Sequence, residues 1–198
     1  MTLPPDLTIY TIGHSNVQVE QLVELLQRFG IRILVDVRSS PYAKYASQFN
    51  REEFKAHPAM KPFNYCYAGK QLGGRPENEV FYDEDGYVLY EDIAKSYTFE
   101  EGLEKLIDLA SKAPTVVMCS EEDPHACHRR LLIGRVLEER GITVKHIRGD
   151  GRLQTEADLA LEETQGQLGL GFEELEATPW RSAQSVLPRK APPDSSDC

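Results

Sequence analysis

The residues with the greatest chemical capacity lie in the stretch SEEDPHACHRR, residues 120–130, which follows an apolar run at residues 115–119. These eleven residues hold three carboxylates, two histidines, one cysteine and two arginines. The spacing that follows predicts a helix from about residue 126 to 140, so that Cys127, His128 and Arg129 begin a helix. Free backbone N–H groups and the helix dipole favour anions there and lower the pKa of a thiol. The stretch therefore predicts an anion site or a reactive thiolate.

Two further polar clusters follow predicted strands. Gly13, His14 and Ser15 come directly after the first strand, and Asp36 and Arg38 close the second. In open α/β sheets, ligands bind beyond the carboxyl ends of the strands. Each cluster taken alone is as well explained by an ordinary loop, with His14 capping a helix. Their coincidence on one edge of the sheet favours a site.

The elements that must position these clusters alternate between strand and helix. Residues 8–13 and 31–37 are β-rich runs, and residues 17–29 between them have helical spacing closed by Gly30. A capping box at residues 98–101 predicts a helix through residue 110, followed by strands at 115–119 and 143–147 on either side of the 126–140 helix. We therefore predict an α/β fold, doubly wound, with a mainly parallel sheet of about five strands and helices on both faces.

Residues 39–90 interrupt this alternation. They are predicted to be mostly loop, with a helix at 51–56, a strand at 63–67 and a turn in Leu72-Gly-Gly-Arg-Pro76. Such a long irregular segment is usually functional or disordered.

Charge divides the 198-residue chain into two predicted parts. The formal net charge is −10, and residues 156–176 hold seven acidic and no basic residues. We predict an α/β domain over residues 1–150 and an acidic, weakly helical to disordered extension over 151–198, ending in LPRKAPPDSSDC. The overall charge argues against non-specific binding to a nucleic-acid backbone, which requires a basic face.

Hydropathy and cysteine usage indicate the cellular compartment. No apolar run approaches the length of a membrane span, and MTLPPDL has none of the features of a signal peptide. A cytoplasmic protein without membrane contact is therefore expected. The four cysteines, Cys66, Cys119, Cys127 and Cys198, are scattered, which favours reduced thiols over structural disulfides.

Four ordered motifs resemble a known family. They are TIGHS (11–15), DVRSSP (36–41), LGGR (72–75) and C-x-E…CHR (119–129), and together they are similar to the domain of unknown function 488 family, DUF488. The resemblance runs from about residue 8 to residue 150. It implies a fold and a set of motif positions, but no agreed reaction.

A weaker resemblance concerns the layout of rhodanese-like proteins. An Asp-Val-Arg strand end, then Val-Val-Met-Cys, a loop, a helix and a Gly-Asp-Gly turn are similar to that layout, in which the cysteine after the strand is the nucleophile. Here the loop after Cys119 is longer and acidic, which disfavours an anion cradle. A sulfurtransferase is therefore a minor alternative.

These observations assign roles to individual residues. The predicted ligand is a small anion, phosphorylated or nucleotide-like, the nucleotide resting on fold analogy alone. In an enzyme, His14 and Asp36 would transfer protons and Cys127 would supply the thiol. The predicted ligand-binding residues are Ser15, Arg38, Tyr67, Gly73, Gly74, Arg75, Glu121, His128 and Arg129.

Other interpretations stay open. Cys119, Cys127 and His128 are metal-ligand types, but their spacing matches no standard zinc pattern, and adjacent residues rarely both reach one ion. Arg130 and His125 are better explained as solvated surface residues. A non-catalytic regulatory or interaction module would bury Arg38 in a closed ion pair with Asp36, whereas a catalytic pocket would set Cys127 or Asp36 facing His14. The cofactor, protein partners and reaction are not specified by the sequence.

Overall fold

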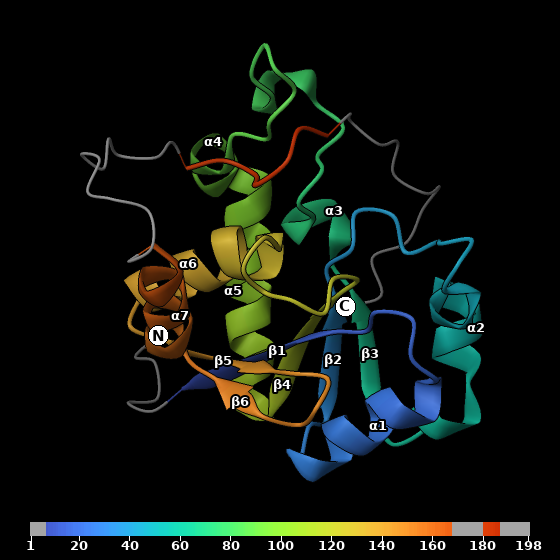
Figure 1. Ribbon diagram of the computed structural model, residues 1–198. Helices are drawn as coiled ribbons and strands as arrows, with labels where there is room; N and C mark the ends of the chain where they lie inside the picture. Colours follow the sequence, from blue (N-terminus) through green and yellow to red (C-terminus); the bar gives the residue numbers. More distant parts are fainter. Residues whose placement is uncertain (1–6, 168–179, 187–198) are drawn as a thin grey trace.

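A six-stranded sheet organises the computed structural model, which describes residues 7–167 and 180–186 (Figure 1). The strand order is β3-β2-β4-β1-β5-β6, and every pair is parallel except β5 with β6. The strands are β1 (Thr8–Gly13), β2 (Ile33–Asp36), β3 (Asn64–Tyr67), β4 (Thr115–Cys119), β5 (Thr143–Ile147) and β6 (Leu153–Gln154). The predicted α/β class and mainly parallel sheet are confirmed.

Helices cover both faces of this sheet because neighbouring strand residues point to opposite sides. Val116 and Met118 of β4 pack in one core with α1 (Val19–Arg28) and α2 (Arg51–Ala56). Val117 and Cys119 of the same strand pack in a second core, which includes α5 (Tyr97–Lys112). The doubly wound arrangement follows from this alternation.

Several shorter helices complete the described chain. They are α3 (Gly69–Leu72), α4 (Tyr90–Ala94), α6 (Arg135–Glu139) and α7 (Glu156–Gln167), with 3₁₀ turns at Ser47–Phe49, Pro58–Met60 and Glu79–Phe81 and a π-helical segment at Arg129–Gly134. Within residues 7–167 and 180–186, no helix is both long enough and apolar enough to cross a bilayer.

Two predicted helix starts differ from those observed. α1 begins at Val19 rather than at residue 17, because Gln18 occupies the capping position. α5 begins at Tyr97 and not at the predicted capping box, because the Ser96 hydroxyl accepts a hydrogen bond from the backbone N–H of Phe99. The α1 end is as predicted, since Gly30 adopts a φ of 66° that favours glycine.

The long segment after β2 contains more regular structure than expected. The predicted helix at 51–56 is α2, and the predicted strand at 63–67 is β3, which pairs with β2 at the edge of the sheet. Its remaining turns carry the Leu72-Gly-Gly-Arg75 motif back over the carboxyl ends of the strands.

The helix after β4 is irregular next to the candidate site. One helix over residues 126–140 was predicted, whereas a π-helical segment at Arg129–Gly134 precedes α6. Such segments occur frequently at functional sites. The loop before it crosses the end of β1, where a Cβ on Gly13 would lie 1.6 Å from the Glu121 carbonyl oxygen. Gly13 therefore allows the loop after β4 to lie against the sheet.

Residues after 150 also contact the main fold. β6 extends the sheet, the indole N–H of Trp180 donates to the Leu131 carbonyl at 2.5 Å, and Ser182 exchanges hydrogen bonds with Val88. The domain division at residue 150 stays a prediction. Residues 187–198, for which we predicted disorder, lie outside the described residues.

Candidate functional site

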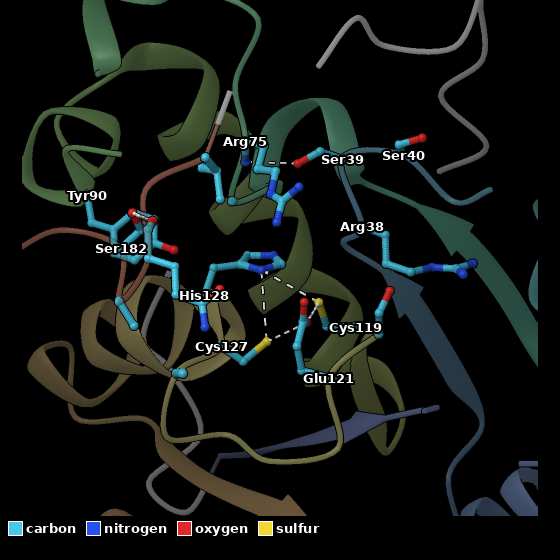
Figure 2. Close-up of a pocket in the computed structure, with 16 residues that line it drawn as sticks. Arg38, Ser39, Ser40, Arg75, Tyr90, Cys119, Glu121, Cys127, His128 and Ser182 are labelled. Carbon is cyan, nitrogen blue, oxygen red and sulfur yellow. Dashed lines mark hydrogen bonds between the residues drawn. The ribbon is translucent and has the colours of Figure 1, made fainter. Parts of the chain in front are cut away.

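A pocket of about 330 Å³ lies at the carboxyl ends of β2 and β4 (Figure 2). It is enclosed by residues that follow these strands, by the turn after α3, by α4 and by residues 182–186. Sixteen residues line it: Arg38, Ser39, Ser40, Gly74, Arg75, Tyr90, Cys119, Ser120, Glu121, Ala126, Cys127, His128, Ser182, Ala183, Gln184 and Val186.

The floor of the pocket holds four side chains that we call the thiol cluster: Cys119, Glu121, Cys127 and His128. The thiols of Cys119 and Cys127 both donate to Oε2 of Glu121, at 2.9 and 3.2 Å. Nδ1 of His128 lies 3.6 Å from the Cys119 sulfur and 4.0 Å from the Cys127 sulfur. Both cysteines and His128 are buried; Glu121 is exposed as a residue, but its carboxylate is partly buried against the two thiols.

The ring of His128 is held in a fixed orientation. Its Nε2 lies 3.2 Å from the Val37 carbonyl oxygen, which can only accept, so Nε2 is the donor. Nδ1 consequently faces the two sulfurs. A Cβ on Gly74 would lie 2.5 Å from Cγ of His128, so the second glycine of the LGGR motif leaves room for the ring.

The side chains of the thiol cluster shift one another's pKa values. Burial opposes ionisation of Glu121, but the hydrogen bond from the Cys119 thiol and the charge of His128 outweigh it and lower the pKa of Glu121 to about 2. Burial also opposes ionisation of Cys127, whose pKa is lowered well below the ordinary value by hydrogen bonds from Cys119 and His128 and by the charge of Arg129.

The pKa values of Cys119 and His128 are raised. The hydrogen bond to Cys127, together with burial, raises the pKa of Cys119. Burial lowers the pKa of His128, but its interactions with Cys127 and Glu121 raise it more. Cys127 therefore has the greater thiolate character of the two cysteines, because its neighbours donate hydrogen bonds to it.

Arg75 lies on the opposite wall of the pocket. Its backbone N–H donates to Oγ of Ser39 at 2.9 Å, and its guanidinium lies near the His128 ring (Figure 2). Among the described residues, no carboxylate pairs with this guanidinium. The hydroxyl of Tyr90 also has no hydrogen-bond partner in the described chain, and burial, with the nearby Cys127, raises its pKa. Arg75 and Tyr90 therefore offer free donors to a ligand.

Beside the pocket is a second polar cluster, which we call the Asp36–Arg38 cluster: His14, Asp36, Arg38 and Tyr65. Arg38 donates to both carboxylate oxygens of Asp36, at 2.9 and 2.6 Å, and the Tyr65 hydroxyl donates to Asp36 at 2.8 Å. Arg38 also donates to the Phe49 carbonyl at 2.9 Å. Although Arg38 is one of the residues lining the pocket, its guanidinium points away from it (Figure 2).

His14 belongs to this closed cluster. Its Nε2 accepts a hydrogen bond from Arg38 at 3.0 Å, and its Nδ1 donates to the Ser15 carbonyl at 2.6 Å. Burial, followed by the charge of Arg38, lowers the pKa of His14 to about 4. His14 is therefore a neutral histidine at neutral pH, and Arg38 stands between it and Asp36.

The structure brings together some of the predicted site residues and separates others. Gly74, Arg75, Glu121, Cys127 and His128 line the pocket, with Arg38 at its margin. The lining does not include six predicted residues, His14, Ser15, Asp36, Tyr67, Gly73 and Arg129. The predicted meeting of His14 with Asp36 or Cys127 as reacting partners is thus not seen.

Three of these residues support the pocket from behind. Arg129 is fully buried and donates to the backbone carbonyls of Glu121 and Glu122, at 2.5 and 2.6 Å, which fixes the loop after β4. Tyr67 stacks under the Arg51 guanidinium and donates to the Ser39 carbonyl. Gly73 packs where a Cβ would lie 2.2 Å from the Gly69 carbonyl oxygen.

The expectation for Arg130 was wrong. This residue is only 8% exposed and pairs with Glu156 at 2.9 Å and with Glu163 at 2.6 Å, so it links the π-helical segment to α7. The acidic residues of α7 supplied the partners that the local sequence around Arg130 lacks. His125 is partly exposed and contacts Asp123.

Sequence reasoning missed several lining residues. Ser39 and Ser40 directly follow Arg38 in the DVRSSP motif, so their position after a strand was an available signal. Tyr90 and Ser182 reach the pocket through contacts between distant segments, and no local pattern marks them.

Fold and site together define a class: an α/β protein with a strand-end pocket whose floor combines two thiols, an imidazole and a carboxylate. The chain belongs to the family described as Domain of unknown function DUF488, whose model matches residues 18–136, more than half of the sequence. The match contains the whole thiol cluster and Arg75, whereas the TIGHS motif precedes it. No curated protein and no solved structure matches the chain significantly.

Proposed function

We propose that this protein binds a small anionic ligand, of the phosphorylated-metabolite class, in the pocket under Arg75. The observation that carries the proposal is the Arg75 guanidinium, a cation directed into the pocket with no carboxylate partner among the described residues. Arginine forms paired hydrogen bonds with phosphate and carboxylate groups, so an unpaired arginine over a pocket is suited to such a ligand.

Neighbouring donors support the same ligand chemistry. The Ser39 Oγ accepts from the backbone N–H of Arg75, which leaves its hydroxyl hydrogen to donate to a ligand. The Tyr90 hydroxyl is a second unengaged donor. A volume of about 330 Å³ is at the lower end of small-molecule sites and suits a compact ligand better than a dinucleotide.

The Asp36–Arg38 cluster has a supporting role in this proposal. Sequence reasoning favoured Arg38 and Arg129 for the anion. The donors of Arg38 are used by Asp36, Phe49 and His14. Arg129 is fully buried and donates to two backbone carbonyls. Arg75 therefore replaces Arg38 as the anion-binding residue. The closed Asp36–Arg38 pair is the arrangement expected of a non-catalytic module, so the proposal concerns binding and names no reaction. The sulfurtransferase alternative stays a prediction from the sequence.

Paired ligands test this function. Binding of phosphate, pyrophosphate, AMP and glucose 6-phosphate would be measured by thermal shift and calorimetry, with adenosine and glucose as uncharged counterparts, since a ligand of the folded state raises its apparent stability. We expect at least one phosphorylated compound to bind and its counterpart not to bind.

Variants of the same protein locate the binding. Arg75→Ala should abolish it and Arg75→Lys should weaken it, whereas Arg152→Ala, at an exposed arginine paired with Asp150, should leave it unchanged. Equal affinity of wild type and Arg75→Ala for the anion would overturn the proposal.

A further inference from the structure

The thiol cluster has a geometry that also suits a metal ion. One donor atom each of Cys119, Cys127 and His128 lies within 4.8 Å of the other two. The distances from Nδ1 of His128 to the two sulfurs are 3.6 and 4.0 Å. A tetrahedral ion with ordinary metal–sulfur and metal–nitrogen bonds places such atoms about 3.6 Å apart. The three side chains thus already surround a point that an ion could occupy.

We infer that Cys119, Cys127 and His128 bind a divalent metal ion of the zinc class, with the Glu121 carboxylate as the fourth ligand. Two thiolates and an imidazole form a soft donor set, which selects zinc and its neighbours over magnesium or calcium. Oε2 of Glu121 lies 2.9 and 3.2 Å from the two sulfurs, so this carboxylate is next to both thiolate ligands.

Groups around the cluster hold these ligands in place. Metal-binding histidines typically donate their second ring nitrogen to a backbone carbonyl or a carboxylate, and Nε2 of His128 donates to the Val37 carbonyl. Arg129 holds the backbone carbonyl of Glu121 itself, which fixes the loop that carries this carboxylate. Two of the four proposed ligands, His128 and Glu121, are therefore held in place by neighbouring groups.

Cys127 and His128 are adjacent in the sequence, which normally disfavours binding to the same ion. Adjacent residues seldom reach the same ion because their side chains diverge. Here Cys127 and His128 stand at the start of the helical segment, and Sγ of Cys127 lies 4.0 Å from Nδ1 of His128. Cys119 arrives from the end of β4 and completes the set.

The inference is independent of the proposed function, although it bears on it. An anion under Arg75 would lie above the Glu121 carboxylate, which repels it. A bound cation would neutralise this floor, and Glu121, the one exposed residue of the four, is the ligand that an incoming anion could displace.

Cobalt substitution tests the site. The full chain, reduced, treated with chelator and desalted under nitrogen, would be titrated with Co²⁺ and then with Zn²⁺. We expect one ion per chain, thiolate-to-cobalt charge-transfer bands in the near ultraviolet, visible bands of tetrahedral intensity, and loss of both on adding zinc. A spectrum of six-coordinate cobalt without charge-transfer bands would overturn the inference.

Variants identify the ligands. Cys119→Ser and Cys127→Ser should each weaken cobalt binding at least 100-fold, and Glu121→Gln, on an exposed loop that should fold normally, about 10-fold to 100-fold. Cys66→Ala is the matched control, because Cys66 is a buried thiol of β3 outside the cluster, and it should bind cobalt like wild type. Folded Cys119→Ser and Cys127→Ser proteins that keep wild-type affinity would refute the assignment.

Two controls separate the competing explanations. Arg75→Ala should keep cobalt binding even if it loses the anion, so failure of one proposal does not imply failure of the other. A reduced chain that binds no cobalt, but loses two hydrogen atoms in mass on mild oxidation by a disulfide reagent, would replace the metal site with a Cys119–Cys127 redox pair.

Discussion

Two polar clusters lie side by side at the carboxyl edge of the sheet, and they differ in how their hydrogen bonds are completed. In the Asp36–Arg38 cluster, the protein itself supplies the partners of the carboxylate and the guanidinium. In the thiol cluster, two thiols share one carboxylate oxygen, and unengaged donors of Arg75 and Tyr90 face the same pocket. The first cluster has the features of a structural unit, and the second has those of a binding site.

Arg38→Ala should have the largest effect on folding. It leaves the fully buried Asp36 carboxylate without its cation, and breaking one side of a buried pair costs about 3–5 kcal/mol of unfolding free energy. Urea denaturation at neutral pH measures this loss. A variant with wild-type stability that fails to bind the anion would instead show that Arg38 binds the ligand. The Asp36–Arg38 cluster would then be part of the binding site and not a structural unit.

Acidification should weaken the Asp36–Arg38 cluster next. The pKa of His14 is lowered to about 4 from 6.5, so between these values the unfolded chain binds a proton that the folded chain excludes. The contribution of His14 is therefore complete above pH 6.5 and is lost as the pH falls toward 4, by about 3 kcal/mol in total.

Unfolding free energies measured from pH 7 to pH 4 test this dependence. His14→Gln should flatten the slope in this range, whereas His57→Gln, a partly exposed histidine beside α2, should keep it. An unchanged slope in His14→Gln would mean that His14 is already charged in the folded protein.

Tyr65→Phe should cost less, about 1.5 kcal/mol. It removes one hydrogen bond to the buried Asp36 carboxylate but leaves both Arg38 contacts in place. Chemical denaturation gives the value. A loss as large as that of Arg38→Ala would show that the phenol, rather than the guanidinium, satisfies the carboxylate.

Arg75→Ala should have the smallest effect, within about 0.5 kcal/mol of wild type. Its partly exposed guanidinium makes no ion pair within the described chain, so folding does not depend on it. Denaturation and anion binding measured on the same preparation provide the contrast. A marked loss of unfolding free energy would show that Arg75, like Arg38, stabilises the folded protein.

The sequence was sufficient for the parts of the fold whose signals are local. β4 and β5 have the predicted bounds, because each is rich in β-branched residues and closely follows a proline or a glycine. The CHR motif was correctly placed at the start of a helical segment.

The sequence could not show which polar side chains form hydrogen bonds and ion pairs with one another. Asp36 and Arg38 acquire their closing partners, Tyr65 and the Phe49 carbonyl, from the irregular segment after β2. Since these partners are set by packing and not by spacing, the sequence favoured Arg38 for the anion, although its donors are engaged within the protein. The approach of the Cys119 sulfur to the His128 ring likewise depends on packing between separate elements.

Ser182 belongs to a wall of the pocket that is synthesised later than the other walls. Residues 182–186 form one wall, and Ser182 is fastened to Val88 by two hydrogen bonds. During synthesis, the sheet and the thiol cluster emerge from the ribosome well before this wall does. A nascent chain can therefore fold its first strands before its pocket is closed, and the pocket takes its final shape only after residues 182–186 have emerged.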